Sequence, residues 1–161
     1  MSKKIKDSKD NFGSLYNDFI IGETYRHWPG KTITESDNNI FCLITMNHHP
    51  VHLDNHFAET QHHGKILVVG TLVFSLTVGL TVSDISGAAI ANLSYENIKH
   101  INPVFIGDTL YAQTKIIDKT NTKSGRKGIV HVQSIGYNQL NEKVIEFERK
   151  ILFGLSGEQK K

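Results

Sequence analysis

The stretch TMNHHPVHLDNHFAET, residues 45–60, holds four histidines, one aspartate and one proline within sixteen residues. Histidine is the side chain best suited to proton transfer near neutral pH, and it is also the commonest metal ligand in proteins. The composition therefore fits an acid/base site, a metal site or a polar loop. Because Pro50 restricts His49 to extended backbone, we expect the stretch to be a loop rather than a helix.

Hydrophobic spacing predicts the elements that must position this loop. A first strand is expected within IIGETYRHW, and Thr34 with Asp37 forms a variant capping box that starts a short amphipathic helix. Residues 70–84 have leucines at i+4 spacing and are apolar almost all round, which predicts a helix wrapped by other structure. Alternating polarity then predicts antiparallel strands within 88–104, 108–118, 128–140 and 142–155.

A long helix followed by an antiparallel meander that curls round it is an α+β architecture. The chain has 161 residues, enough for one domain with a substantial core. We expect a flexible N-terminal tail over residues 1–15, a single domain over 16–155 and a C-terminal tail over 156–161.

Charge and cysteine content narrow the class of protein. The formal net charge is only +2, and several lysines lie at the chain ends, which argues against a nucleic-acid partner. The single cysteine, Cys42, cannot form an internal disulfide and fits a reducing, cytoplasmic location, where a buried inert thiol is expected. No apolar region follows the charged N-terminus, so we expect no secretory signal.

Residues 66–83 are the only segment long enough to suggest a membrane span. They carry no charge over 18 residues, the lower limit for crossing a bilayer, but seven of them are Gly, Ser or Thr. Basic and aromatic anchors do not flank both ends. A buried helix in a protein without a membrane partner is the better interpretation.

Four segments, in the same order along the chain, resemble the R-specific enoyl-CoA hydratases and MaoC-like dehydratases. They are KTITESDNNIF, MNHHPVHLDNHFA, VVGTL and NPVFIGDTL, and the resemblance covers about residues 20–153. The piece NHHPVHLD is most similar to the mesaconyl-CoA or itaconyl-CoA hydratase branch, whose substrates carry a second carboxylate. The resemblance implies a hotdog fold, a homodimer or higher homo-oligomer, and an acyl-CoA substrate. It implies no cofactor apart from the coenzyme A of that substrate.

The resemblance also assigns residues. His52 falls on the catalytic histidine of the family, Asn47 stands where that family usually has an aspartate, and His49 stands where it has an asparagine. An amide cannot act as a general base. We therefore expect His52 to carry out both proton steps of hydration, with Asn47 orienting the water or the carbonyl. Loss of hydratase activity, and a role of Asn47 as a helix C-cap, stay open.

Hydration of an enoyl thioester also needs hydrogen-bond donors for the enolate oxygen. The start of the predicted buried helix, at Val69 and Gly70, would supply backbone N–H groups together with the helix dipole. The alternative explanation for a glycine at position 70 is that it allows close packing of the helix on the sheet. Arg26, His27 and Lys31 form a small cationic group that would bind a distal carboxylate, with a solvated strand edge as the alternative. His49 is a further candidate for substrate binding.

Two other functions compete with hydration. His52, Asp54 and a distant histidine such as His131 have the ligand types of a 2-His-1-carboxylate iron site, although we expect no metal. The amide at Asn47 instead favours an acyl-CoA binding protein without catalysis, or a thioesterase on the same fold, which would need a carboxylate that Asn47 does not provide.

Overall fold

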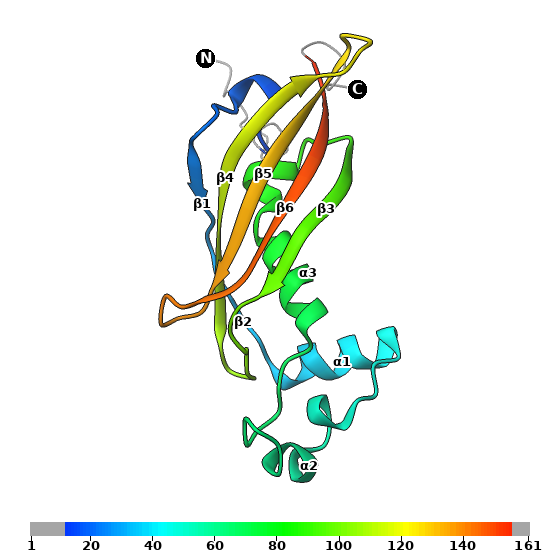
Figure 1. Cartoon of the computed structure of the whole chain (residues 1–161), viewed down its shortest axis with the longest axis vertical. Helices are drawn as coiled ribbons and strands as arrows, with labels where there is room; N and C mark the ends of the chain where they lie inside the picture. Colours follow the sequence, from blue (N-terminus) through cyan, green and yellow to red (C-terminus); the bar gives the residue numbers. More distant parts are fainter. Residues whose placement is uncertain (1–11, 156–161) are drawn as a thin grey trace, which may run out of the picture.

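The computed structural model describes residues 12–155 and places a curved antiparallel sheet beside a central helix (Figure 1). The strands are β1 (Thr24–Arg26), β2 (Lys31–Thr32), β3 (Ala91–His100), β4 (Thr109–Asn121), β5 (Lys127–Tyr137) and β6 (Lys143–Gly154). The helices are α1 (Glu35–Thr45), α2 (Asn55–Glu59) and α3 (Gly70–Leu80), with 3₁₀ turns η2 (Tyr16–Asp18) and η3 (Pro50–His52) and a π turn η4 (Val82–Ser86).

The predicted meander is wrong in one respect, the position of its first strand. The strand order is β1-β4-β5-β6-β3, so β3 pairs with β6 at one edge and not with β4, while β2 pairs with β4. The chain crosses to β4 past the start of α3, where the Val104 carbonyl accepts a hydrogen bond from Val68 N–H at 2.9 Å. This contact fixes the crossing segment to the residues that lead into α3.

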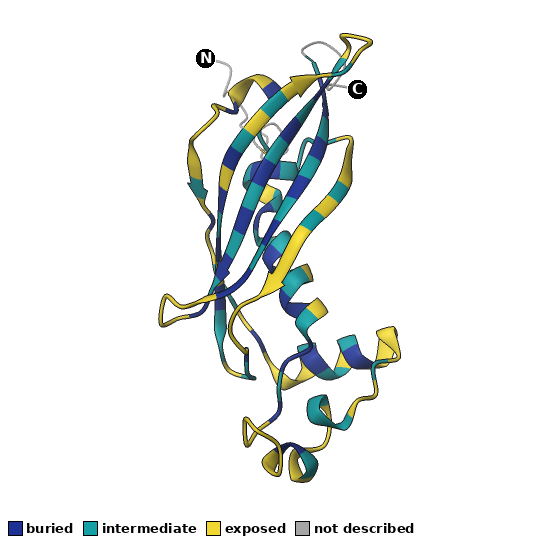
Figure 2. Cartoon of the chain, in the orientation of Figure 1, coloured by how far each residue is buried: buried dark blue, intermediate teal, exposed yellow. Residues whose placement is uncertain are grey.

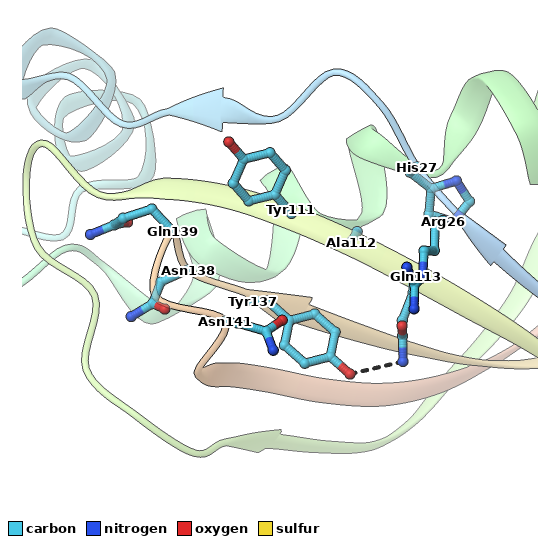
Figure 3. A pocket seen from close by; sticks show the side chains of 9 residues that line it. All are labelled: Arg26, His27, Tyr111, Ala112, Gln113, Tyr137, Asn138, Gln139 and Asn141. Atoms are coloured by element: carbon cyan, nitrogen blue, oxygen red, sulfur yellow. Dashed lines mark hydrogen bonds between the residues drawn. The ribbon is translucent and has the colours of Figure 1, made fainter.

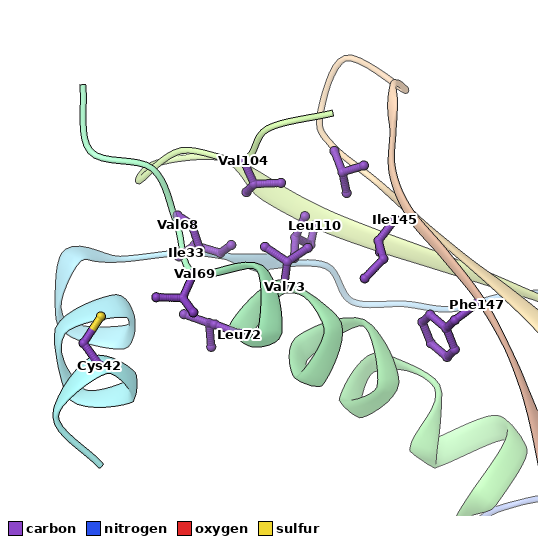
Figure 4. Packing of buried hydrophobic residues seen from close by; sticks show 11 residues of the cluster. Ile33, Cys42, Val68, Val69, Leu72, Val73, Val104, Leu110, Ile145 and Phe147 are labelled. Carbon is purple, nitrogen blue, oxygen red and sulfur yellow. The ribbon is translucent and has the colours of Figure 1, made fainter. Parts of the chain in front are cut away.

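The core lies between α3 and the face of the sheet that alternate residues of β4, β5 and β6 line (Figure 2). At the N-terminal end of α3, Leu72 and Val73 pack with Ile145 and Phe147 of β6 (Figure 4). Gly136 of β5 allows the close approach, because a Cβ there would lie 2.9 Å from Thr77 Oγ1.

A charged side chain is enclosed at the other end of α3. Arg149 of β6 is fully buried and donates hydrogen bonds to Thr81 Oγ1 at 2.6 Å and to Asn92 Oδ1 at 3.5 Å. Its Nε has no hydrogen-bond partner among residues 12–155. Burial lowers the pKa of the Arg149 guanidinium. The inner face of β6 is thus apolar beside the first turns of α3 and polar beside its last turn.

Helix α1 starts as the sequence predicts. Thr34 Oγ1 accepts a hydrogen bond from Asp37 N–H at 3.2 Å, and Asp37 Oδ2 accepts one from Thr34 N–H at 2.8 Å, which completes the capping box. The buried side of the helix is, however, Asn38 and Cys42, whereas Ile44 is 74% exposed. Burial raises the pKa of the Cys42 thiol, as expected of an inert cysteine.

The sheet packs against one side of α3, as predicted, and the opposite side of the helix is open in the single chain. Thr71, Ser75 and Gly79 lie along an exposed side of the helix. The neighbouring edge strand β3 exposes large apolar side chains, including Leu93 at 51% and Ile98 at 44%. Residues 12–155 therefore leave one side of α3 and the β3 edge of the sheet uncovered.

Most of the predicted tails, residues 1–11 and 156–161, lie outside the described residues. Within the predicted N-terminal tail, Gly13 N–H donates to the Ser83 carbonyl at 2.8 Å and Ser14 N–H to the Asp84 carbonyl at 3.2 Å. These residues therefore pack on η4 together with the rest of the domain. None of the helices in residues 12–155 has the length and hydrophobicity needed to cross a membrane.

Candidate active site

His52 is held at the end of η3 with one ring nitrogen engaged. The half-buried ring places Nδ1 2.6 Å from the Leu67 carbonyl oxygen, in the segment that leads into α3. A carbonyl oxygen only accepts hydrogen bonds, so Nδ1 must carry the proton and donate it. Nε2 is then the nitrogen with a free lone pair, as a general base requires.

Asn38 ties the His52 turn to the start of α3, and sequence reasoning missed it. Its side chain is fully buried: Nδ2 donates to the His52 carbonyl at 2.9 Å, and Oδ1 accepts from Val69 N–H at 3.1 Å. Such a bridge joins three segments that are distant in sequence. The signal in the sequence was weak: Asn38 stands four residues before Cys42 and therefore lies on the same side of the amphipathic helix α1.

The first turn of α3 offers backbone donors, but not at both predicted positions. Val69 N–H is already donated to Asn38, so the prediction of Val69 as a donor to substrate is wrong. The N–H groups of Gly70 and Thr71 donate to no other group within the part of the chain that the structure describes. They stand at the positive end of the α3 dipole and suit an oxygen that develops negative charge.

A cavity of about 240 Å³ opens at the start of α3. Gly70 and aliphatic side chains such as Val68 and Val73 line it, together with three polar side chains, His63, His100 and Asn102. Leu67 also lines this cavity and accepts the hydrogen bond from His52, whose own ring is not part of the lining, so one residue links the imidazole to the cavity.

Asn47 and His49 lie on the loop between α1 and η3. The C-cap of α1 is Met46, in left-handed conformation with φ 58°, so the interpretation of Asn47 itself as the C-cap is wrong by one residue. Among residues 12–155, the half-buried Asn47 side chain accepts one long hydrogen bond, 3.4 Å, from His49 N–H. His49 Nδ1 accepts from Val51 N–H at 3.2 Å, and its ring lies 6.0 Å from the His52 ring between centroids.

The predicted cationic group is not assembled. His27 is buried: its Nδ1 donates to Asp84 Oδ2 at 2.6 Å, and its Nε2 lies 2.9 Å from Thr114 Oγ1. Burial lowers the pKa of His27, although hydrogen bonding to Asp84 opposes that shift. Lys31 pairs with Asp37 at 2.7 Å. The interpretation of His27 as a substrate ligand is therefore wrong, since both of its nitrogens serve the core.

Arg26 lies in a different place from His52. In β1 it pairs with Gln113 of β4, on the face of the sheet turned away from α3, and both line an open cavity of about 650 Å³ (Figure 3). This cavity shares no lining residue with the one at the start of α3. Within the single chain, the structure does not bring Arg26 to the predicted site.

The ligands of the alternative metal site are dispersed. Asp54 caps α2, accepting a hydrogen bond from Phe57 N–H at 3.0 Å. His131 lies on β5 with Nε2 2.9 Å from Glu148 Oε2. Among the described residues, the group able to hold a metal ion is Glu96, His131 and Glu148, and there a Lys150 ammonium already occupies Glu96 at 2.8 Å. His52 belongs to no such group within residues 12–155.

Comparison with known protein families agrees with the geometry. The model of the MaoC-like domain matches residues 17–138, well over half of the chain. The chain belongs to the MaoC-like family. Beta-methylmalyl-CoA dehydratase of Chloroflexus aurantiacus is 34% identical over 145 residues, 90% of this chain and 41% of that protein. Mesaconyl-CoA hydratase of Cereibacter sphaeroides is 31% identical over 144 residues, 89% of this chain and 42% of that protein.

Solved structures confirm the hotdog fold of this MaoC-like chain. A MaoC domain protein dehydratase from Chloroflexus aurantiacus superposes with a TM-score of 0.87 at 33% identity, over 91% of this chain and 42% of that chain. A protein from Mycobacterium tuberculosis with a double hotdog fold gives a TM-score of 0.81 at 22% identity, over 92% and 46%. The chain thus spans about two fifths of the length of the curated relatives that it matches.

Proposed function

We propose that this chain reversibly adds water to the double bond of a short enoyl-CoA thioester. One observation carries the proposal: the His52 ring is bonded through Nδ1 to the Leu67 carbonyl, which leaves Nε2 without a partner among the described residues and ties the ring to the segment that leads into α3, whose first N–H groups are unpaired. A base and donors for a developing oxyanion are the two elements that this reaction needs.

In the proposed mechanism, the thioester oxygen accepts hydrogen bonds from Gly70 and Thr71. His52 Nε2 removes a proton from water, whose oxygen forms a bond to Cβ of the acyl group. The π electrons of the double bond move through Cα to the thioester oxygen, giving an enolate. The protonated His52 then donates its proton to Cα, the electrons return, and the imidazole is neutral again.

Asn47 supports the assignment of both proton steps to His52. An amide has no basic lone pair, but it donates and accepts hydrogen bonds and so orients a water molecule. The carboxylate nearest in sequence, Asp54, is engaged in capping α2. His49, 6.0 Å from His52 between ring centroids, would contact the substrate on the same side of the loop.

The substrate class follows from the relatives and the cavity. Relatives that are 31–34% identical are named for beta-methylmalyl-CoA and mesaconyl-CoA. A cavity of about 240 Å³ suits a short acyl chain. We therefore propose a short dicarboxylic enoyl-CoA of the mesaconyl or itaconyl type, with coenzyme A entering as part of the substrate and no other cofactor.

A second copy of the chain is the proposed partner. The exposed edge of β3, with Leu93 and Ile98, and the open side of α3 together present unpaired strand groups and apolar surface. Pairing β3 with its counterpart would extend the sheet. Light scattering should show a dimer or larger assembly, and Ile98→Lys should dissociate it; a monomer that is fully active would contradict this.

The unpaired, buried Cys42 fits the proposed cytoplasmic location.

Incubation of the purified protein with mesaconyl-, itaconyl- and crotonyl-CoA tests the proposed function. Loss of the absorbance of the conjugated thioester, without release of free thiol, is the expected result. Release of thiol would indicate a thioesterase instead. Tight binding with neither change would indicate an acyl-CoA binding protein, the function that the amide at Asn47 favours as the alternative.

A further inference from the structure

His100, the last residue of β3, lies directly against the start of α3. A Cβ placed on Gly70 would be 3.0 Å from His100 Cε1 and 3.1 Å from Nε2. The imidazole therefore touches the backbone that presents the unpaired N–H groups. Because Gly70 and His100 line the same cavity, any acyl group whose thioester oxygen reaches Gly70 must also lie next to this ring.

His100 and His63 are the two polar side chains of this cavity that make no hydrogen bond with another described residue, and of the two it is His100 that contacts Gly70. The His100 ring makes no hydrogen bond or ion pair with another residue of the described chain. Asn102 Nδ2 already donates to the Lys143 carbonyl at 2.7 Å. The His63 ring packs on Phe105, with centroids 5.7 Å apart, and Phe105 also carries the Lys65 ammonium at 3.9 Å from its centroid.

We propose that His100 is the specificity-determining residue that binds the second carboxylate of the acyl group. The inference rests on the proposed function, which places the thioester oxygen at Gly70. In a mesaconyl group, a five-carbon dicarboxylic acyl group with one methyl branch, the second carboxylate is bonded to Cβ, only a few bonds from the thioester carbonyl. A donor in contact with Gly70 is therefore within reach of it, whereas Arg26 and His27 are not in this cavity.

Apart from His63 and Asn102, the side chains that line the cavity with His100 are aliphatic. Aliphatic walls such as Val68, Val73 and Val104 cannot compensate a carboxylate for the water that it loses. A hydrogen bond from an imidazole N–H, strengthened when the ring is protonated, does so. An acyl group with a methyl in place of the carboxylate gains nothing from His100.

Succinyl-CoA carries a second carboxylate where butyryl-CoA has a methyl group, and the two are otherwise identical. Both are saturated, so neither can be hydrated. Their dissociation constants, measured by calorimetry, test recognition apart from chemistry. Succinyl-CoA should bind the wild type more tightly. His100→Phe keeps a ring but removes the donor, so it should weaken succinyl-CoA about 10- to 100-fold and leave butyryl-CoA within about threefold. His100→Gln, which keeps a donor, should recover part of the preference.

His131→Phe is the matched control, because His131 lies on the opposite face of the sheet from α3. The kinetic counterpart is a selective rise of KM for mesaconyl-CoA over crotonyl-CoA in His100→Phe. Equal weakening of both saturated thioesters, or an unchanged preference in a folded His100→Phe protein, overturns the inference. A wild type that prefers succinyl-CoA through His100 but hydrates no thioester would support His100 and refute the proposed reaction.

Discussion

Replacing Asn38 by alanine should loosen the proposed catalytic base from the helix that faces it. The amide is fully buried and satisfies two backbone groups, the His52 carbonyl at 2.9 Å and the Val69 N–H at 3.1 Å. The truncated side chain satisfies neither. Asn38→Asp is the finer variant, since its carboxylate still accepts from Val69 but cannot donate to His52.

The magnitude follows from the two groups left unpaired. Val69 is 3% exposed, so its lost partner costs about 2 kcal/mol, while the half-buried His52 carbonyl costs nearer 1 kcal/mol. With the space left by the truncated side chain, the free energy of unfolding should fall by about 2–4 kcal/mol. For a domain of this size, the fall corresponds to a Tm roughly 4–16 °C lower.

Urea unfolding and hydration kinetics, both recorded well below the lower Tm, form the assay. kcat/KM should fall about 10- to 100-fold in the folded Asn38→Ala protein, because a displaced base reacts poorly. The neighbouring Asn39→Ala is the control: Asn39 makes no side-chain hydrogen bond within residues 12–155 and should change stability by less than about 0.5 kcal/mol. If Asn38→Ala matches that control in stability and turnover, the bridging role of Asn38 is refuted.

Two further outcomes concern the fold. Gly136→Ala should lower the free energy of unfolding by about 1–3 kcal/mol, because its Cβ would lie 2.8 Å from Ile145 Cγ2 and 2.9 Å from Thr77 Oγ1; an equally stable variant would contradict this packing. The pKa of His27 is lowered by burial, so below the ordinary histidine value of about 6.5 the unfolded chain binds a proton there more readily than the folded one. The free energy of unfolding of the wild type should then fall from pH 7 towards pH 5. Urea unfolding of His27→Gln should show a smaller fall over the same pH range. An equal or steeper fall would contradict the assignment of this pH dependence to His27.

Local patterns predicted much of this structure. The capping box at Thr34 and Asp37, the helix from Gly70 and the alternation in the last four strands depend on residues close in sequence, and each element forms. The α+β class follows from their order, whereas the hotdog fold was implied by the resemblance to the MaoC-like dehydratases. The position of β3 beside β6 depends instead on long-range pairing that alternation does not encode.

The candidate site divides in the same way. His52 and Gly70 were indicated by their flanking motifs, and the structure joins their segments through Leu67. Asn38 was missed because its partners lie 14 and 31 residues away. His27 was taken for a surface cation because its partner Asp84, 57 residues distant, cannot be found from spacing.

The kinetics of His52→Ala test the central claim most directly, with His48→Ala, an exposed neighbouring histidine, as control. With mesaconyl-CoA as substrate, the removal of an acid/base group predicts a fall in kcat of about 10²- to 10⁴-fold for His52→Ala. His48→Ala should stay within about threefold of the wild type. A folded His52→Ala protein that hydrates the thioester at the wild-type rate would contradict the account.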